Sequence, residues 1–321
     1  MVKRETAKVA KRPAATNGSA PTQKVATEKR AATREAASLA KPEKSSAESP
    51  PDPNYPLYRI VPGSNVTLSD VNADESEHYT GKRDVAEELD RQRKRIRDLQ
   101  ERLYAERQRS LLIVLQAMDT GGKDGTIRGV FQGVNPQGCQ VWSFKAPSTE
   151  EMEHDFLWRY HLKAPSRGLI TIFNRSHYEE VLIVRVKNLM PEDVWRRRYA
   201  MINEFEQMLS LNNTTIIKFY LHISKEEQKQ RLQSRLDDSS KHWKFSSADL
   251  KERAFWDQYM AAFEESVESC STEVAPWYVV PSNKKWYRNL VIARTIADTL
   301  DAMNPQFPDA EKGLAKLKIV D

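Results

Sequence analysis

Apolar residues recur at helical spacing in one stretch of the chain and then form short, uninterrupted runs. The spacing in residues 84–108 predicts an amphipathic helix, whose apolar side is made by Val85, Leu89, Ile96, Leu99 and Leu103. The apolar run of residues 111–115 follows at once and predicts a strand over 111–117. A helix leading directly into a buried strand is the start of an alternating pattern.

Short apolar runs and helical stretches continue to alternate along the rest of the chain. Further strands are expected at 140–144, 169–173, 215–222 and 277–280. Helices are expected at about 124–133, 149–163, 192–211, 224–236, 249–268 and 284–303. Strands that alternate with helices form a parallel sheet covered on both faces, so we predict an α/β fold.

The excess positive charge of the chain lies near its beginning. Of the 50 Lys and Arg and 45 Asp and Glu residues, residues 1–54 hold 11 basic and 6 acidic ones, which leaves 39 of each sign. This segment has one Leu and no aromatic residue and is expected to be a disordered basic tail. Because the remainder is balanced in charge, we expect no specific nucleic-acid partner, and any polyanion site must come from local clustering.

Two further features of the composition bear on location. The chain has no stretch of 18 or more apolar residues, so we expect no membrane partner. Its two cysteines, Cys139 and Cys270, lie too far apart in sequence to indicate a disulfide framework or a zinc site. A cytoplasmic protein is the simplest expectation.

The first predicted strand leads into a glycine-rich turn that carries a lysine. Residues 116–126 read Gln-Ala-Met-Asp-Thr-Gly-Gly-Lys-Asp-Gly-Thr, and a helix-compatible stretch follows. A turn of this kind directs backbone N–H groups and a helix N-terminus to one point, where both favour a phosphate. We therefore predict phosphate binding by Gly121, Gly122, Lys123, Gly125 and Thr126; a tight turn that merely contains a lysine is the alternative.

The loop departs from the Walker A pattern G-x-x-x-x-G-K-[ST] in two places. Ala117 replaces the first glycine, and Asp124 replaces the hydroxyl residue that would bind Mg²⁺. A second carboxylate, Asp119, lies within the loop. Two carboxylates repel a phosphate unless a cation lies between them, and oxygen ligands combined with phosphates suit Mg²⁺. We expect Asp119 and Asp124 to bind Mg²⁺, with Mn²⁺ as the alternative ion.

The strand at 169–173 leads into Asn174 and Arg175. Ligands of open α/β sheets bind beyond the carboxyl ends of the strands, so both residues should lie beside the loop. The planar guanidinium of Arg175 suits phosphate oxygens. We expect Arg175 to be catalytic together with Asp119 and Lys123, and to bind the nucleotide together with Asn174. The alternative is an arginine that pairs with one of the glutamates at 179–180.

Two basic groups later in the chain extend the predicted polyanion site. Arg231 and Arg235 are four residues apart and share one helical face, and Lys244 follows in a polar turn. We expect this helical hairpin to be a lid that closes over phosphates and excludes water. Lys284, Lys285 and Arg288 lie at the start of the last helix, where cations oppose the helix macrodipole and indicate a nearby anion. A solvated surface is the alternative for each group.

Four segments together resemble the polyphosphate kinase 2 family. They are Ala-Met-Asp-Thr-Gly-Gly-Lys-Asp-Gly, Asn-Arg-Ser-His-Tyr-Glu-Glu, Trp-Lys-Phe-Ser and Ala-Pro-Trp-Tyr-Val-Val-Pro, within a block from about Tyr58 to Leu300. The resemblance implies a P-loop nucleotide-kinase-like fold with a helical lid, and Mg²⁺-dependent phosphoryl transfer between inorganic polyphosphate and a nucleotide. It carries roles onto Asp119, Lys123, Asp124, Arg175 and the lid arginines. Many members have Asp where Asn174 stands, and the second segment looks like the class III subgroup, which accepts AMP as well as ADP.

These expectations define a domain plan and a reaction. The chain should consist of the tail at 1–54, a P-loop kinase domain at 55–303 with a lid at about 224–265, and a C-terminal extension at 304–321. The enzyme should convert AMP to ADP and ADP to ATP reversibly, or act on the guanine counterparts. We also expect a homo-oligomer, a dimer or a tetramer, although the sequence does not give the oligomeric state. The alternatives are an ATP-dependent nucleotide or nucleoside kinase and a non-catalytic polyanion-binding P-loop protein.

Overall fold

The computed structural model describes residues 57–314 and 317–319, so the predicted tail at 1–54 lies outside the described residues. Every described residue belongs to one unit of the chain. Among the described residues, no helix is both long enough and apolar enough to pass through a membrane.

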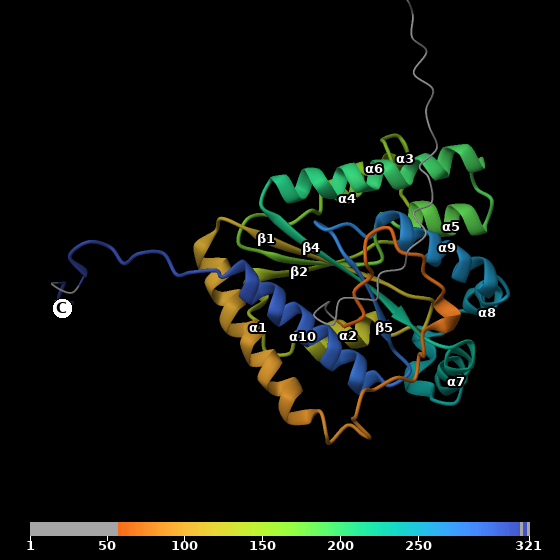
Figure 1. The fold of residues 1–321 in the computed structure, drawn as a ribbon, viewed down its shortest axis with the longest axis horizontal. Helices are drawn as coiled ribbons and strands as arrows, with labels where there is room; N and C mark the ends of the chain where they lie inside the picture. Colours follow the sequence, from red (N-terminus) through yellow and green to blue (C-terminus); the bar gives the residue numbers. More distant parts are fainter. Residues whose placement is uncertain (1–56, 315–316, 320–321) are drawn as a thin grey trace, which may run out of the picture. The chain divides into compact units, whose positions relative to one another are not determined.

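Five parallel strands form one sheet in the order β2-β3-β1-β4-β5 (Figure 1). Their bounds are β1 Ser110–Gln116, β2 Cys139–Ser143, β3 Ile170–Asn174, β4 Thr214–His222 and β5 Trp277–Pro281. β1 lies in the middle and pairs with β3 on one side and β4 on the other. The predicted α/β fold with a parallel sheet is therefore confirmed.

Helices cover both faces of this sheet (Figure 1). α1 and α10 contact each other along one face together with α2, and α5, α6 and α9 contact one another on the opposite face. The α-helices are α1 Ala86–Glu106, α2 Lys123–Val130, α3 Thr149–Met152, α4 Trp158–His161, α5 Glu179–Val186, α6 Glu192–Leu211, α7 Lys225–Leu236, α8 Ser247–Arg253, α9 Trp256–Cys270 and α10 Lys285–Met303. Short 3-10 helices are η1 Leu68–Asp70, η2 Pro136–Gly138 and η3 Ser239–Lys244.

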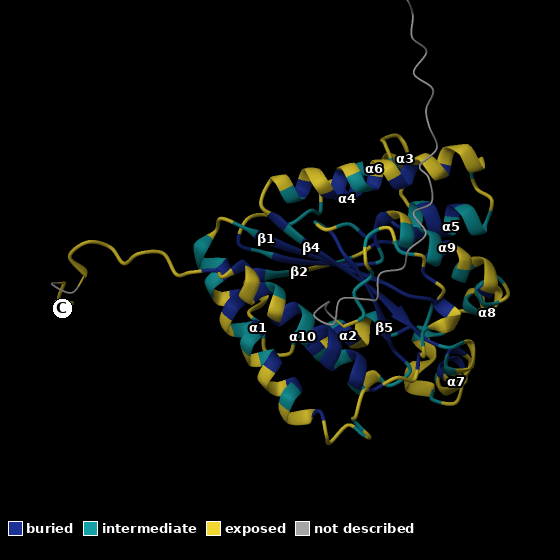
Figure 2. Ribbon diagram, in the orientation of Figure 1, coloured by how far each residue is buried: buried dark blue, intermediate teal, exposed yellow. Residues whose placement is uncertain are grey.

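The apolar run in β1 supplies both cores. Leu111, Ile113 and Leu115 belong to the core under α1 and α10, whereas Leu112 and Val114 belong to the core under α5, α6 and α9. All five are buried, as the dark strands of Figure 2 show. A strand covered on both faces is apolar at every position, which is why its sequence is continuous rather than alternating.

Two expected helices need correction, and one observed helix was not expected. The helix expected at 149–163 is wrong as one element, because the chain turns between α3 and α4, where the Asp155 carboxylate accepts the Leu157 N–H at 2.9 Å. The helix expected at 249–268 is likewise two helices, α8 and α9. The sequence analysis did not predict α5, whose β-branched Val181, Ile183 and Val184 do not mark a helix by their pattern.

Candidate active site

The loop after β1 has a backbone that few residues can adopt. α2 begins at Lys123, and its N-cap Gly122 has φ +104°. A Cβ atom at Gly122 would lie 2.1 Å from an Nη atom of Arg288, so both the dihedral angle and the close approach require glycine. Thr120 has φ +64° in the same loop. Non-glycine residues in this left-handed region are strained, and such strain is concentrated at functional sites.

The carboxyl end of β3 is joined to this loop by two side-chain contacts. Arg175, which also has a positive φ of +62°, pairs with the Asp119 carboxylate at 2.7 Å. Asn174 donates from Nδ2 to the carboxylate of Asp124 at 2.7 Å. Strand pairing aligns the two segments, because Leu115 lies opposite Asn174. The expected proximity of the loop and the β3 end is thus observed, and the hydrogen bond of Arg175 is to Asp119 rather than to a following glutamate.

Lys123 is folded back over the loop, where its Nζ donates to the carbonyl oxygen of Ala117 at 3.0 Å. Burial, followed by the repulsive charge of Arg175, lowers the pKa of Lys123 to about 8. Burial also raises the pKa of Glu179, despite the nearby cationic Arg175 and Lys123. The protein's own carboxylates therefore do not fully balance the positive charge of Lys123. Such a lysine is expected where a bound phosphate supplies the missing negative charge.

Arg231 on α7 braces the loop against the start of α10. Its Nε donates to Glu227 on the same helix at 2.6 Å. Both Nη atoms donate to backbone carbonyl oxygens at 2.6–3.0 Å, those of Thr120, Gly121, Ser282 and Asn283. All five N–H donors of the guanidinium are thus used within the protein. Arg231 remains a predicted polyphosphate-binding residue, but only its charge is free to act on a ligand.

Arg288 on α10 is a buried guanidinium beside the same loop, with only 2% of its surface exposed. Its hydrogen bonds go to neutral oxygens, the Asn289 side chain at 2.9 Å and the Gly121 carbonyl at 3.5 Å. Within residues 57–314 and 317–319, no carboxylate lies within ion-pair distance of it. Burial and the adjacent Arg231 charge lower the pKa of Arg288. An anion in front of Gly122 would compensate this charge.

These groups surround one cavity of about 940 Å³ at the carboxyl edge of the sheet. Of the sequence-predicted site residues, those lining it are Asp119, Gly121, Gly122, Lys123, Asp124, Gly125, Asn174, Arg175, Arg231, Arg235, Lys244 and Lys285. Thr126 and Lys284 do not line it. Thr126 is buried and donates to the Gly122 carbonyl at 3.2 Å, while Lys284 donates to the hydroxyl of Ser76 at 2.9 Å.

Several lining residues were not predicted to belong to the site. They are Arg128, Lys145, Glu227, Trp243 and Asp249, along with uncharged neighbours. Arg288, which the sequence placed with Lys284 and Lys285 near an anion, also lines the cavity, as does Lys241 of the basic hairpin. Lys145 lies two residues beyond β2, at the same edge of the sheet as Arg175, and the strand-end rule could have found it.

The predicted metal ligands are the carboxylates of Asp119 and Asp124. Within the described residues, no group of three or more His, Cys, Asp or Glu side chains could hold a metal ion. Asp119 and Asp124 both line the cavity, beside Lys123. Mg²⁺ is commonly bound by one or two carboxylates together with substrate phosphates, so this pair fits a metal shared with a phosphorylated ligand.

Comparison with known proteins identifies the family. The model of the family Polyphosphate kinase 2 (PPK2) matches residues 79–308. The AMP/ADP-polyphosphate phosphotransferase of Meiothermus ruber is 50% identical over 263 residues, covering 82% of this chain and 98% of that protein. The ADP-polyphosphate phosphotransferase of Rhodopseudomonas palustris is 45% identical over 264 residues, covering 78% and 91%.

A solved structure agrees with the sequence relatives. The crystal structure of Polyphosphate Kinase 2 from Arthrobacter aurescens TC1 is similar with a TM-score of 0.77 and 46% identity, covering 81% of this chain and 93% of that one. The resemblance seen in the four sequence segments is therefore confirmed. Together with the P-loop-like cavity, these likenesses show that the chain belongs to the polyphosphate kinase 2 family, whose members catalyse phosphoryl transfer between polyphosphate and nucleotides.

Proposed function

We propose that this protein transfers the terminal phosphoryl group of inorganic polyphosphate to AMP and to ADP, forming ADP and ATP, and that both transfers are reversible. Each forward step forms a bond from an acceptor phosphate oxygen to the terminal phosphorus and breaks the bond between that phosphorus and its bridging oxygen, which leaves with a polyphosphate shorter by one unit. The observation that supports it best is the single cavity into which the loop at 119–125, Arg175 and the basic residues of α7, η3 and α10 all face. The names of two similar proteins give the same acceptors.

The side chains have separable roles in this proposal. Because the acceptor phosphate itself attacks, no protein nucleophile is required, and catalysis rests on position and charge. Lys123, the α2 N-terminus and Arg288 hold the phosphoryl group beside the loop, where their positive charge stabilises the transition state. Arg175, held by Asp119, holds the opposite side of the transferred group, and Asn174 lies beside the acceptor.

Asp119 and Asp124 are the proposed ligands of Mg²⁺, and Mn²⁺ is the alternative. When bound, the ion would neutralise charge on the phosphate oxygens. Asn174 holds Asp124 through its amide, and Arg175 holds Asp119, so both carboxylates keep fixed positions before a ligand arrives. An Asp119→Asn variant should require more Mg²⁺ for half-maximal rate than wild type, and an unchanged requirement would remove Asp119 from the metal site.

The polyphosphate chain is proposed to run along a basic track from the loop to α7 and α10. Arg235, Lys241, Lys244 and Lys285 line the cavity beyond the loop. The Arg235 guanidinium donates to the Lys244 carbonyl at 2.9 Å and lies 3.4 Å from the Asp249 carboxylate, which holds α7, η3 and α8 together. A repeated polyanion needs several spaced cations rather than one pocket, and this arrangement supplies them.

The moving part of the lid is proposed to comprise η3 and α8, whereas Arg231 fixes α7 to the loop and to the start of α10. The lid expected from the sequence extends to about residue 265. In the structure, however, Ala262 and Phe263 of α9 belong to the core, at 0% and 4% exposure. By contrast η3 and α8 have no buried residue, so their displacement would expose little apolar surface.

The deciding experiment incubates the protein with polyphosphate, Mg²⁺ and either AMP or ADP, and separates the nucleotides by chromatography. Formation of ADP from AMP and of ATP from ADP is the expected result. A parallel reaction supplies ATP as the sole donor with AMP as acceptor, which tests the rival ATP-dependent nucleotide kinase. Product with ATP but none with polyphosphate would refute the proposal, and no product with either donor would favour a non-catalytic polyanion-binding protein.

Five expectations remain predictions for the same protein. Guanine nucleotides are tested as acceptors in the same assay. A homo-oligomer and a cytoplasmic location are expected. The domain plan likewise remains a prediction for the basic tail at 1–54 and for the extension at 304–321.

A further inference from the structure

The phosphate loop is held by two side chains of α7. Gln228 donates from Nε2 to the carbonyl oxygen of Asp119 at 3.0 Å. Arg231, three residues later on the same helical face, donates to the carbonyl oxygens of Thr120 and Gly121. Three consecutive carbonyl groups of the loop therefore point toward α7. In a trans peptide the N–H group points opposite to the carbonyl group, so the N–H groups of these three peptides point away from α7.

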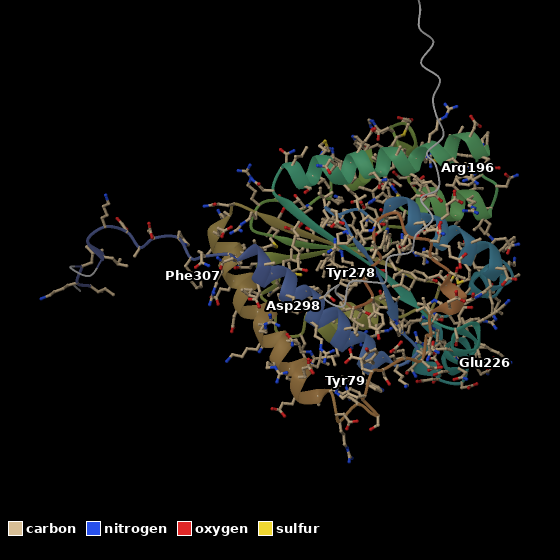
Figure 3. The ribbon with its side chains drawn as sticks, viewed as in Figure 1. Tyr79, Arg196, Glu226, Tyr278, Asp298 and Phe307 are labelled. Atoms are coloured by element: carbon tan, nitrogen blue, oxygen red, sulfur yellow. The ribbon has the colours of Figure 1, made fainter. Side chains whose placement is uncertain are left out.

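Gln228 is a polar side chain at a buried position. Only 1% of its surface is exposed, whereas Glu226, two residues earlier, is exposed. Figure 3 labels Glu226 at the outer side of α7. Gln228 does not line the cavity, so it acts through the loop rather than on a substrate. Buried amides are retained where their polar atoms have partners, and the partners of Gln228 show what it does.

Arg253, the last residue of α8, is the second partner of Gln228. Its Nη1 donates to Oε1 of Gln228 at 3.0 Å and to the carbonyl oxygen of Lys225 at 2.5 Å. A guanidinium only donates hydrogen bonds, and a backbone carbonyl oxygen only accepts them. The amide of Gln228 therefore has one orientation that satisfies both neighbours, with its oxygen toward Arg253 and its nitrogen toward Asp119. A carboxylate or an apolar side chain at this position cannot supply both interactions.

We propose that Gln228 is a positioning residue for phosphoryl transfer, which fixes the peptide group of Asp119, and that Arg253 fixes the amide of Gln228. The relay Arg253–Gln228–Asp119 connects the end of α8, which belongs to the proposed lid, to the loop that receives the phosphoryl group. The Asp119 carboxylate is held separately by Arg175 at 2.7 Å. Gln228 thus holds the backbone of the residue whose side chain Arg175 holds.

The loop requires this support because its backbone is strained. Thr120, directly after Asp119, has φ +64°, a conformation that is a genuine outlier for a β-branched residue. Such a conformation persists only where the surrounding structure holds it. Gln228 fixes the peptide before Thr120, and Arg231 fixes the peptide after it. Without Gln228, the peptide joining Asp119 to Thr120 is free to rotate, and it carries the Asp119 side chain with it.

Hydrogen exchange of the protein without substrate or metal tests the relay directly. Gln228→Met keeps the length of the side chain and removes both hydrogen bonds. Gln228→Glu keeps an acceptor for Arg253 and removes the donor to Asp119. Both variants should raise amide exchange in residues 119–122 about fivefold over wild type, as expected for the loss of one hydrogen bond. Arg253→Met should raise it less, and should add nothing in the Gln228→Met background.

The catalytic consequence rests on the proposed function and is measured separately. With polyphosphate, Mg²⁺ and ADP, both Gln228 variants should lower kcat by about tenfold or more, because a displaced loop misplaces the reacting groups. They should also need more Mg²⁺ for half-maximal rate, since the Asp119 carboxylate loses its fixed position. A smaller folded fraction would lower the rate without changing the Mg²⁺ requirement. A wild type inactive with polyphosphate would refute the proposed function, and the exchange measurement would still decide whether Gln228 holds the loop.

Gln233→Met is the matched control. Gln233 lies on the exposed side of the same helix, where it donates to Asp237 at 2.7 Å. This variant should keep the wild-type loop exchange, kcat and Mg²⁺ requirement, and thermal unfolding should show every variant to be folded at the assay temperature. Wild-type loop exchange in both Gln228 variants would overturn the proposal. Faster loop exchange with an unchanged kcat and Mg²⁺ requirement would also overturn it, because Gln228 would then have only a structural role.

Discussion

Gly122 offers the most exacting test of the phosphate loop. It caps α2 with φ +104°, and a methyl group at this position would lie 2.1 Å from an Arg288 Nη atom and 3.2 Å from its Cζ. A Gly122→Ala variant must therefore strain the backbone or displace a buried guanidinium. Both changes fall on the segment where we place the transferred phosphoryl group.

The magnitude follows from these two contributions. A non-glycine residue held in the left-handed region costs about 1–2 kcal/mol, and up to about 3 kcal/mol where the surroundings cannot relax. For a domain of this size each kcal/mol lowers Tm by about 2–4 °C. A displacement of about 1 Å at a site of this kind costs about 100-fold in rate. We expect Gly122→Ala to lower kcat/KM by about 100-fold while lowering Tm by only a few degrees.

The assay pairs steady-state kinetics with thermal unfolding, and Gly125→Ala is the stability control. A methyl group at Gly125 meets only Arg288 Nη2, at the ordinary contact distance of 3.5 Å, and the residue lies in helical backbone. Its Tm should equal or exceed that of wild type, because alanine favours a helix over glycine by up to about 1 kcal/mol. Wild-type kcat/KM and Tm in Gly122→Ala would refute the close approach of Arg288 and the loop geometry with it.

Three other predictions follow from named groups. The Lys123 pKa of about 8 means that this lysine is protonated below pH 8, so the KM for polyphosphate should rise as the pH passes about 8; a flat pH profile would contradict the role of its charge. Lys218→Met should lower the free energy of unfolding by about 3–5 kcal/mol, because it leaves the buried Glu206 carboxylate without its cation. The double variant Lys218→Met/Glu206→Gln should recover part of this loss, and denaturant unfolding measures both values. Arg235→Gln should raise the KM for polyphosphate and leave Tm unchanged. Arg231→Gln should raise this KM and also lower Tm, because all five donors of Arg231 bind the protein. An equal change in Tm for the two variants would contradict the structural role of Arg231.

The sequence by itself determined the layered fold and the chemistry of its loops. Strands buried on both faces are mainly apolar, so β1, β3 and β4 were visible as apolar runs, and the amphipathic α1 was visible by its spacing. The glycines, Lys123 and Asp119 directly after β1 indicated a phosphate site, because ligands meet parallel sheets at the strand ends. These signals are local, and each depends on a few consecutive residues.

The tertiary structure decided what distant residues do to one another. The need for glycine at position 122 comes from Arg288, which lies 166 positions later in the chain. Arg231 donates to backbone carbonyl oxygens of the loop. Lys284 and Thr126 lie outside the cavity, although their residue types suit a phosphate. The extent of α9 packing depends on contacts that no local pattern contains. Residue type limits what a side chain can bind, but only the fold determines which partner occupies its donors.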